Sequence, residues 1–345
     1  MKDYLHDLPR VRINHLPTPM ARLDRLSDTL GGPRILIKRD DLTGPALGGN
    51  KTRKLEFLLG DALRQSCDTV ITGGAMQSNH SRQTAGAAAA VGLECHLALG
   101  GEKPRVASGN LLLDHLFGAV IHWCGEQTKG ERIPEIAEQL RQRGRKPYVI
   151  PYGGSNTIGA AAFVEAIREL TTQLEDTSVD AIVIASASGG THAGMTVGID
   201  AHGLKAALVG IAVDRHDPGD PTYESQLASL ANDTARMLGL HGSYDENSFA
   251  LRYEYYGAGY AIMGNAEREA IRLVASCEGL ILDPVYTGRA MAGLIDMVKK
   301  GEYSPDETVL FRHTGGTPAI FGYADEFAIE RAGNAAIAAG RIDEG

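Results

Sequence analysis

The sequence predicts an α/β fold in which helices cover a parallel sheet on both faces. Short β-branched runs alternate along the chain with longer alanine-rich stretches, which is the pattern of strands that alternate with helices. Several of these runs end directly in glycine or a small polar residue, where an alanine-rich stretch begins. With 345 residues, of which 43% are hydrophobic, the chain can form two domains or one large one.

The predicted elements follow one another in a regular order. The predicted strands, all short apolar runs, are Arg34 to Lys38, Thr69 to Thr72, Glu94 to Leu99, Ala119 to Trp123, Pro147 to Ile150, Ala181 to Ala185, Ala207 to Ala212 and Thr308 to Phe311. The predicted helices are Lys51 to Arg64, Ser81 to Val91 and Ala193 to Ala201. Residues 324–345 are expected to form a helix followed by a frayed acidic end.

Two strand-to-helix junctions are rich in small polar residues. Gly73 to His80 leads into the helix that begins at Ser81, and Ser186 to Thr191 leads into the helix that begins at Ala193. In open α/β sheets, ligands bind at such junctions. Because no proline-rich linker divides the chain, a boundary between domains is expected to be discontinuous in sequence.

Composition excludes several classes of function. The 43 acidic residues outnumber the 34 basic ones, and a net charge of −9 would repel a nucleic acid backbone. The four cysteines have no CxxC spacing, so free thiols in a reducing compartment are expected. The N-terminus lacks the apolar segment of a signal peptide, and no run approaches the length of a membrane span. A cytoplasmic protein that binds neither nucleic acid nor membrane is therefore expected.

Lys51 is the first candidate for chemistry. It follows Gly48, Gly49 and Asn50 and opens a predicted helix, so glycine allows close approach to a ligand and the helix N-terminus favours a nearby anion. An amine beside a helix N-terminus and other cations gives up its proton more readily, which favours a nucleophile. Most lysines in loops are only solvated charges. Together with the polar cluster Gln77 to His80, however, Lys51 makes pyridoxal phosphate the leading cofactor hypothesis.

The loop from Ser186 to Thr191 is a candidate phosphate site. It offers backbone amides and the hydroxyls of Ser188 and Thr191 at the start of a helix. It lacks the lysine of a Walker loop and is not a GxGxxG fingerprint, and an ordinary tight turn remains an alternative.

Other polar residues give weaker signals. Ser78 has no GxSxG surroundings, which disfavours a serine hydrolase. His80, His192 and His313 lack matching carboxylate or cysteine spacing, so structural histidines are expected and no metal site. Tyr286 follows an apolar run; such a tyrosine usually packs half-buried, but its hydroxyl could act as an acid.

Taken together, these motifs closely resemble the D-cysteine desulfhydrase and 1-aminocyclopropane-1-carboxylate deaminase family of fold type II pyridoxal phosphate enzymes. The matching segments are Leu16 to Pro19, Ile37 to Asp41, Gly48 to Phe57, Gln77 to His80, Gly153 to Asn156, Gly190 to Gly194, Leu282 to Tyr286 and His313 to Gly316. The resemblance extends over nearly the whole chain, to about Tyr323. It implies a fold like that of tryptophan synthase β, with two open twisted, mostly parallel sheets covered by helices. A small domain of residues 53–160 would be inserted into a large domain of residues 1–52 and 161–345, with the cofactor in the cleft. It also suggests a homodimer.

The resemblance implies roles for the residues at the cofactor. Lys51 would hold pyridoxal phosphate as a Schiff base and transfer the substrate α-proton, and Asn79 would hydrogen-bond the phenolic oxygen. The phosphate would be held by Ser188, Gly189, Gly190 and Thr191.

The resemblance also implies roles at the substrate. Ser78 would bind the substrate carboxylate or assist proton transfer, with Asn79 and His80 beside it. Tyr260 would lie near the cofactor ring, and Tyr286 would act near the leaving group.

Three positions favour the desulfhydrase branch of the family. The deaminases carry glutamate, leucine and glutamine where this chain has Thr287, Thr314 and His80. A carboxylate at the pyridine nitrogen would strengthen the ring as an electron sink, whereas a neutral hydroxyl leaves it weaker. Ring opening needs a strong sink, and expulsion of a good β-leaving group does not.

The sequence therefore predicts a carbon–sulfur lyase that carries out α,β-elimination on a cysteine-like amino acid substrate. D-cysteine would give pyruvate, ammonia and sulfide. The runner-up substrate is L-cysteate, which would release sulfite, and ring opening by a cyclopropane deaminase is less favoured. Outside these activities, a silent pyridoxal phosphate carrier and a nicotinamide oxidoreductase remain alternatives.

Overall fold

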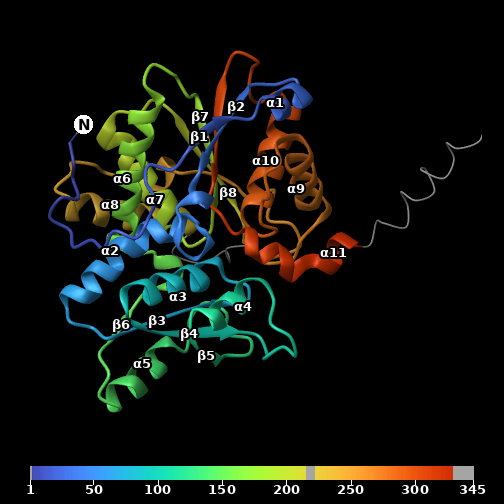
Figure 1. The fold of residues 1–345 in the computed structure, drawn as a ribbon. Coiled ribbons are helices and arrows are strands. Elements are labelled where there is room, and N and C mark those ends of the chain that lie inside the picture. The colour runs from blue at the N-terminus through green and yellow to red at the C-terminus, as the bar shows by residue number, and fades with distance from the viewer. Residues whose placement is uncertain (1, 215–221, 329–345) are drawn as a thin grey trace, which may run out of the picture.

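The computed structural model describes residues 2–214 and 222–328 and contains two sheets covered by helices (Figure 1). Of the predicted terminal helix and frayed end, residues 324–345, the structure describes α11 (Ala324–Ala328), and residues 329–345 lie outside the described residues. Among the described helices, none combines the length and the apolar character that crossing a bilayer requires.

The larger sheet has six strands in the order β1-β2-β10-β7-β8-β9. These strands are β1 (Met20–Arg22), β2 (Arg34–Arg39), β10 (Thr308–His313), β7 (Ala181–Ser186), β8 (Ala207–Ala212) and β9 (Ala250–Arg252). Only the pair β1 and β2 is antiparallel. The sequence did not predict β1 or β9, which have three residues each and lie at the two edges.

The smaller sheet has four parallel strands in the order β5-β4-β3-β6. They are β5 (Val120–Trp123), β4 (Glu94–Gly100), β3 (Thr69–Ala75) and β6 (Pro147–Val149). Every strand predicted from the sequence is present in one of the two sheets, with small differences at the ends, which confirms the α/β fold class.

Helices cover both sheets. They are α1 (Asp24–Leu30), α2 (Asn50–Arg64), α3 (Asn79–Val91), α4 (Gly109–Leu116), α5 (Ile133–Gln142), α6 (Thr157–Leu174), α7 (Gly190–His202), α8 (Tyr223–Met237), α9 (Asn265–Glu278) and α10 (Thr287–Lys299). Figure 1 shows α6, α7 and α8 on one side of the larger sheet and α9 and α10 on the other.

The larger sheet is buried on both faces, and its central strands each contain an uninterrupted apolar stretch. Ile35 and Ile37 of β2 pack towards α1, α9 and α10, whereas Leu36, between them, packs towards α6 and α7. Successive side chains of a strand point to opposite faces, so an uninterrupted apolar run is what a sheet with helices on both sides requires.

Helix α2 joins the two parts of the molecule. Leu55, Leu58 and Leu59 belong to the core of the smaller sheet, while Phe57 packs with residues of α6, α7 and α8. The first turn of α2, which carries Lys51, therefore lies where the two parts meet. The predicted division into residues 53–160 and the rest of the chain stays a prediction.

Candidate active site

One pocket collects most of the candidate residues. Its lining consists of Asn50, Lys51, Ser78, Asn79, His80, Tyr152, Gly153, Ala185, Ser186, Ala187, Ser188, Gly189, Thr191, His192, Tyr286 and Thr314. These residues lie at the first turns of α2, α3 and α7, at the end of β7, in the segments that follow β6, β7 and β10, and directly before α10. Parallel strands of one sheet end on one side, so residues far apart in the sequence converge here. Of the predicted site residues, Gly190, Tyr260 and Thr287 are not part of the lining.

Two glycines give Lys51 its position. Gly48 has φ +69° and Gly49 has φ +132°, and a Cβ on Gly48 would come within 1.9 Å of the Asp41 carbonyl oxygen. Glycine is therefore required for this turn. Burial lowers the pKa of Lys51 from 10.5 to about 8, so about a tenth of the amine is unprotonated at pH 7. That is the form in which an amine attacks a carbonyl group.

A second lysine lies beside the first. Lys54 is fully buried, and its Nζ donates to the carbonyl oxygen of Gly153 at 3.0 Å and to Ser155 Oγ at 3.3 Å. Burial, followed by the charge of Lys51, holds the pKa of Lys54 well below its usual value. Among the described residues, no carboxylate forms an ion pair with Lys54. A buried cation without a counter-ion is costly, so this site is suited to an anionic ligand.

The loop before α7 completes this anion site. Gly190 N donates to Ser155 Oγ at 3.1 Å, Ser155 Oγ donates to Ser188 Oγ at 2.9 Å, and Thr191 Oγ1 accepts from Asn50 Nδ2 at 3.1 Å. A Cβ on Gly190 would come within 2.9 Å of Lys54 Nζ. The hydroxyls, the start of α7 and Lys54 thus surround one position, which fits a phosphate group.

The first turn of α3 forms another part of the wall. Ser78 caps the helix, and its Oγ accepts from Ser81 N at 3.1 Å. His80 Nε2 lies 2.9 Å from Thr72 Oγ1, while Nδ1 has no partner among the described residues. Burial, together with Lys51 and Lys54, keeps the pKa of His80 well below its usual value, so the ring is neutral. This wall offers neutral donors and the start of a helix, which suits a carboxylate.

Tyrosines lie at another side of the pocket. The hydroxyls of Tyr260 and Tyr286 are 2.6 Å apart, and Tyr152 lies within hydrogen-bonding reach of both. Burial raises the pKa of Tyr260 and Tyr286 well above 10, so both hold their protons at neutral pH. They can act as proton donors but not as bases.

The two predicted threonines have different environments. Thr314 lines the pocket, and its carbonyl oxygen accepts from Asn50 N at 2.9 Å. Thr287 is fully buried, and its hydroxyl donates to Asp283 Oδ1 and accepts from Asp283 N, each at 2.7 Å. Of the two hydroxyl residues, only Thr314 therefore belongs to the wall of the pocket.

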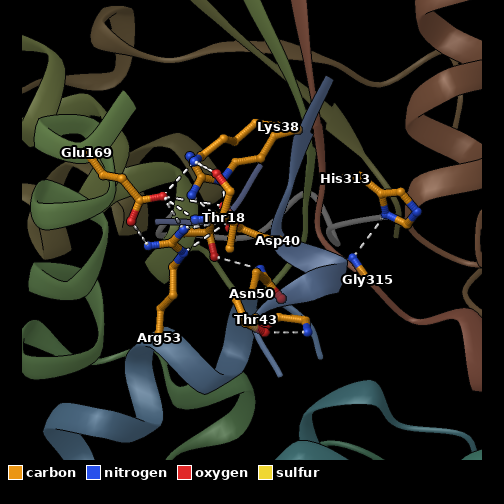
Figure 2. A network of polar contacts seen from close by, with 12 residues as sticks. Thr18, Lys38, Asp40, Thr43, Asn50, Arg53, Glu169, His313 and Gly315 are labelled. Carbon is orange, nitrogen blue, oxygen red and sulfur yellow. Dashed lines mark hydrogen bonds and ion pairs between the residues drawn. The ribbon is translucent and has the colours of Figure 1, made fainter. Parts of the chain in front are cut away.

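A buried ionic network supports the start of α2 (Figure 2). Asp40 Oδ1 accepts from Arg53 Nη2 at 2.9 Å, and Arg53 Nη2 also donates to Glu169 Oε1 at 2.8 Å. Lys38 Nζ donates to the same Glu169 atom at 2.5 Å, and Arg312 Nη2 donates to Asp40 Oδ2 at 2.7 Å. Burial alone would raise the pKa of Asp40, but Arg312 and Arg53 hold it below its usual value. The network ties the ends of β2 and β10 to α2 and α6.

The structure also brings to the site Gln83 and Asn110, to which the sequence assigned no role. The sequence named Lys54 only as a cation near Lys51, and Tyr152 only as a neighbour of the pocket for the β-substituent. A local signal existed for Lys54, which lies one helical turn after Lys51 and hence on the same face. No local signal existed for Asn110, because its contact with Asn79 depends on how α4 packs against α3.

A family model described as "Pyridoxal-phosphate dependent enzyme" matches residues 11–315. The chain is 43% identical over 329 residues to the D-cysteine desulfhydrase of Salmonella newport, an alignment that covers 93% of this chain and 98% of that protein. The D-cysteine desulfhydrase of Salmonella choleraesuis matches with the same identity and coverage.

Solved structures were compared with the fold. The crystal structure of an ACC deaminase homologue superposes with a TM-score of 0.86 and 41% identity, covering 94% of this chain and 97% of its own. A fungal L-serine ammonia-lyase from Rhizomucor miehei superposes with a TM-score of 0.63 and 17% identity, covering 92% and 99%, and at that identity it supports the fold alone.

Proposed function

Because the chain belongs to the pyridoxal-phosphate dependent enzyme family, we propose that it is a carbon–sulfur lyase that eliminates the β-substituent of D-cysteine or a related amino acid. The products are pyruvate, ammonia and sulfide. The observation that carries this proposal is one pocket that holds an amine with a pKa of about 8 beside a buried lysine that lacks a counter-ion. The identity with D-cysteine desulfhydrases over 93% of the chain supports the choice of substrate.

The pocket fits pyridoxal phosphate. Lys54 and the loop from Ser188 to Thr191 would hold the phosphate, Lys51 would bond to the aldehyde carbon, and Asn79 would bind the phenolic oxygen. When bound, the cofactor supplies an electron sink for negative charge at the substrate α-carbon. Without an anion, burial and Lys51 disfavour the charged form of Lys54, and a bound phosphate would stabilise that form, which is the physical reason that this pocket suits a phosphate-bearing ligand.

Lys51 is the base of the proposed reaction. Its Nζ accepts the proton that leaves the substrate α-carbon, and the lowered pKa makes the unprotonated amine available at neutral pH. The first turn of α3, with Ser78 and His80, orients the substrate by binding its carboxylate. Because His80 is neutral, this wall binds the carboxylate through hydrogen bonds and the helix dipole.

Tyr286 is the acid of the proposed reaction. It lines the pocket and shares a 2.6 Å hydrogen bond with Tyr260, and the raised pKa of both keeps a proton available for the departing sulfur. The conjugate acid of a thiolate leaving group has an unperturbed pKa of about 8.5, which lies below the pKa of Tyr286, so full proton transfer is uphill and Tyr286 assists the departing sulfur mainly by donating a hydrogen bond to it.

The wall of the pocket favours elimination over ring opening. None of the described residues that line it is an aspartate or a glutamate, and Thr314 supplies a neutral hydroxyl. A neutral lining cannot hold a proton on the cofactor ring as a carboxylate would, which suits a substrate with a good leaving group.

The cofactor assignment is tested by colour and chemistry. The protein purified with pyridoxal phosphate should be yellow, and borohydride should fix the cofactor covalently on Lys51. The Lys51→Ala variant should lose this adduct, and an exposed lysine variant, Lys205→Ala, should retain it. A wild-type protein that stays colourless and carries no adduct would refute the proposal.

The substrate is tested with a panel. D-cysteine, L-cysteine, β-chloro-D-alanine, D-serine, L-cysteate and the cyclopropane amino acid are supplied in turn, and pyruvate, 2-oxobutanoate, sulfide and sulfite are measured separately. We expect sulfide and pyruvate from D-cysteine and no 2-oxobutanoate. Dominant 2-oxobutanoate would establish a deaminase, sulfite from L-cysteate would establish the runner-up, and no product from any amino acid would indicate a carrier.

We also propose that the enzyme is a homodimer in the cytoplasm. The four cysteines are free thiols, as a reducing compartment requires. Sedimentation of the purified protein at several concentrations measures the oligomer, and a monomer throughout would contradict this part of the proposal.

A further inference from the structure

We propose that Asn110 is a positioning residue that fixes which atom of the Asn79 carboxamide faces the pocket. Asn79 lines the pocket at the start of α3, whereas Asn110 lies on α4, is fully buried and is not part of the lining. The inference rests on the proposed function, because it concerns the donor that Asn79 presents to the cofactor.

The orientation of both amides follows from one backbone atom. Asn110 Nδ2 lies 2.8 Å from the carbonyl oxygen of Gln77 and 2.8 Å from Asn79 Oδ1. A backbone carbonyl can only accept, so the Asn110 atom that faces it must be the nitrogen. The same nitrogen faces Asn79, so the Asn79 atom in this contact must be the oxygen. Asn79 Nδ2 is therefore left to face the pocket.

The Asn110 carboxamide acts only as a donor. Its Oδ1 is buried and has no partner among the described residues. Its backbone N–H donates to Gln77 Oε1 at 2.8 Å, and Gln77 Nε2 donates to the carbonyl oxygen of Ser108 at 3.0 Å, so the start of α4 is held against the turn before α3. Two acceptors on one nitrogen, and none on the oxygen, make the reversed orientation unfavourable.

Asn79 Nδ2 has room because the residue opposite is glycine. Gly316 has φ +101°, and a Cβ there would lie 2.4 Å from Asn79 Nδ2. No described residue accepts a hydrogen bond from this Nδ2. The nitrogen is thus an unused donor at the wall of the pocket, and the negatively charged phenolic oxygen of the cofactor is the acceptor that matches it.

The test measures absorbance of the bound cofactor as a function of pH. A donor that stabilises the phenolic oxygen lowers the proton affinity of the adjoining nitrogen on Lys51. Loss of the donor should therefore raise the pH midpoint of the absorbance change. In Asn110→Leu, Asn79 can turn either atom towards the pocket, and we expect a rise of about one pH unit. In Asn110→Asp, which keeps the shape, Asn79 must turn its Nδ2 away from the pocket to meet the carboxylate. The midpoint should then rise by at least as much.

A double-mutant cycle separates positioning from packing. If Asn110 acts through Asn79, the single variant Asn110→Leu should raise the midpoint of the absorbance change. Adding Asn110→Leu to Asn79→Ala should not raise it further, because no amide remains to be oriented. Asn232→Leu is the control, because Asn232 also bonds a backbone segment through its carboxamide, at Tyr244, but lies outside the pocket. It should leave the midpoint unchanged.

The outcomes are distinct. An equal shift from Asn110→Leu in both backgrounds would overturn the inference and show a packing role. An unchanged midpoint in both Asn110 variants would overturn it as well. If the leucine variant does not fold, Asn110→Asp alone serves for this measurement. A wild-type protein that binds no cofactor refutes the proposed function instead. Cofactor affinity, measured by fluorescence titration, should fall with the same non-additive pattern.

Discussion

At the scale of one residue, Lys54 illustrates how a side chain that binds a ligand can destabilise the protein when the ligand is absent. The side chain is fully buried next to Lys51, and burial lowers its pKa well below the usual value. Such a group destabilises the empty protein and stabilises the complex with an anion. The two effects can be measured separately.

We predict opposite effects for the variant Lys54→Met. Pyridoxal phosphate should bind about 10- to 100-fold more weakly, because a charge-assisted hydrogen bond contributes roughly 1.5 to 3 kcal/mol. The cofactor-free protein should be more stable in urea, because a desolvated amine, whose charged form is disfavoured, is replaced by an apolar chain of similar size. Lys205→Met, at an exposed position, should change neither quantity. Loss of affinity without a gain in stability would contradict this account.

Single site residues could be predicted from the sequence where the local backbone requires a particular residue type, such as glycine. Gly48 and Gly49 mark the turn before Lys51, and the structure shows that neither can carry a side chain there without a clash. The roles of Lys54 and Thr287 depend on partners that are distant in space or absent. The missing counter-ion of Lys54 and the bond from Thr287 to Asp283 are tertiary facts that no local pattern contains.

Helices α2 and α3 are joined at their first turns by Gln83. Helix α2 begins after Gly49 and has no side-chain cap of its own. Gln83 Oε1, from α3, instead accepts from Lys51 N at 2.9 Å and from Thr52 N at 3.1 Å. Its Nε2 donates to the carbonyl oxygen of Asn79 at 2.9 Å. One carboxamide thus caps one catalytic helix and sets its distance from the other.

Removing this link should destabilise the fold, and placing a charge there should alter the pKa of Lys51. We predict that Gln83→Leu lowers the free energy of unfolding by about 1 to 3 kcal/mol, because Lys51 N loses its acceptor and Thr52 N keeps only the carbonyl oxygen of Gly49. Gln83→Glu keeps the acceptor and should cost less, but its charge should raise the pKa of Lys51 and slow catalysis below pH 8. Urea unfolding and pH–rate profiles measure both effects. Gln139→Leu, on the exposed side of α5, is the control, and equal losses from the leucine and glutamate variants would exclude a capping role.

Elements were predictable where their own composition determines them. The central strands are apolar enough to be recognised without their neighbours, as in residues 182–184 of β7. The edge strands β1 and β9 have three residues each, too few to show a period, and they exist because β2 and β8 offer free edges. Helix α4 has eight residues and was not predicted, and the contact of Asn110 with Asn79 could not be anticipated because it depends on how α4 packs against α3.

At the scale of the whole molecule, the site is built where two sheets meet. The smaller sheet supplies the first turn of α3, the larger sheet supplies the loop before α7 and Thr314, and α2 packs against both cores. The network of Asp40, Arg53 and Glu169 anchors α2 to the larger sheet (Figure 2). The position of Lys51 therefore depends on ion pairs that are remote from the chemistry.

This dependence predicts how the molecule responds to acid. Burial alone would raise the pKa of Glu169, but Arg53 and Lys38 lower it from 4.5 to about 2. A depressed pKa contributes stability that is present above pH 4.5 and is lost as the pH falls towards 2, and the difference corresponds to roughly 3 kcal/mol. Urea unfolding of the wild type should therefore show a falling free energy between pH 5 and pH 3.

The variant Glu169→Gln isolates this contribution from general acid unfolding. It should be less stable than the wild type at pH 7, because Lys38 and Arg53 lose a buried partner. The gap should narrow as the pH falls, because protonation removes the same charge from the wild type. Glu138→Gln, at an exposed position on α5, should follow the wild type throughout. A constant gap would mean that Glu169 acts through packing, and Lys51 would then be held by the shape of α2 rather than by charge.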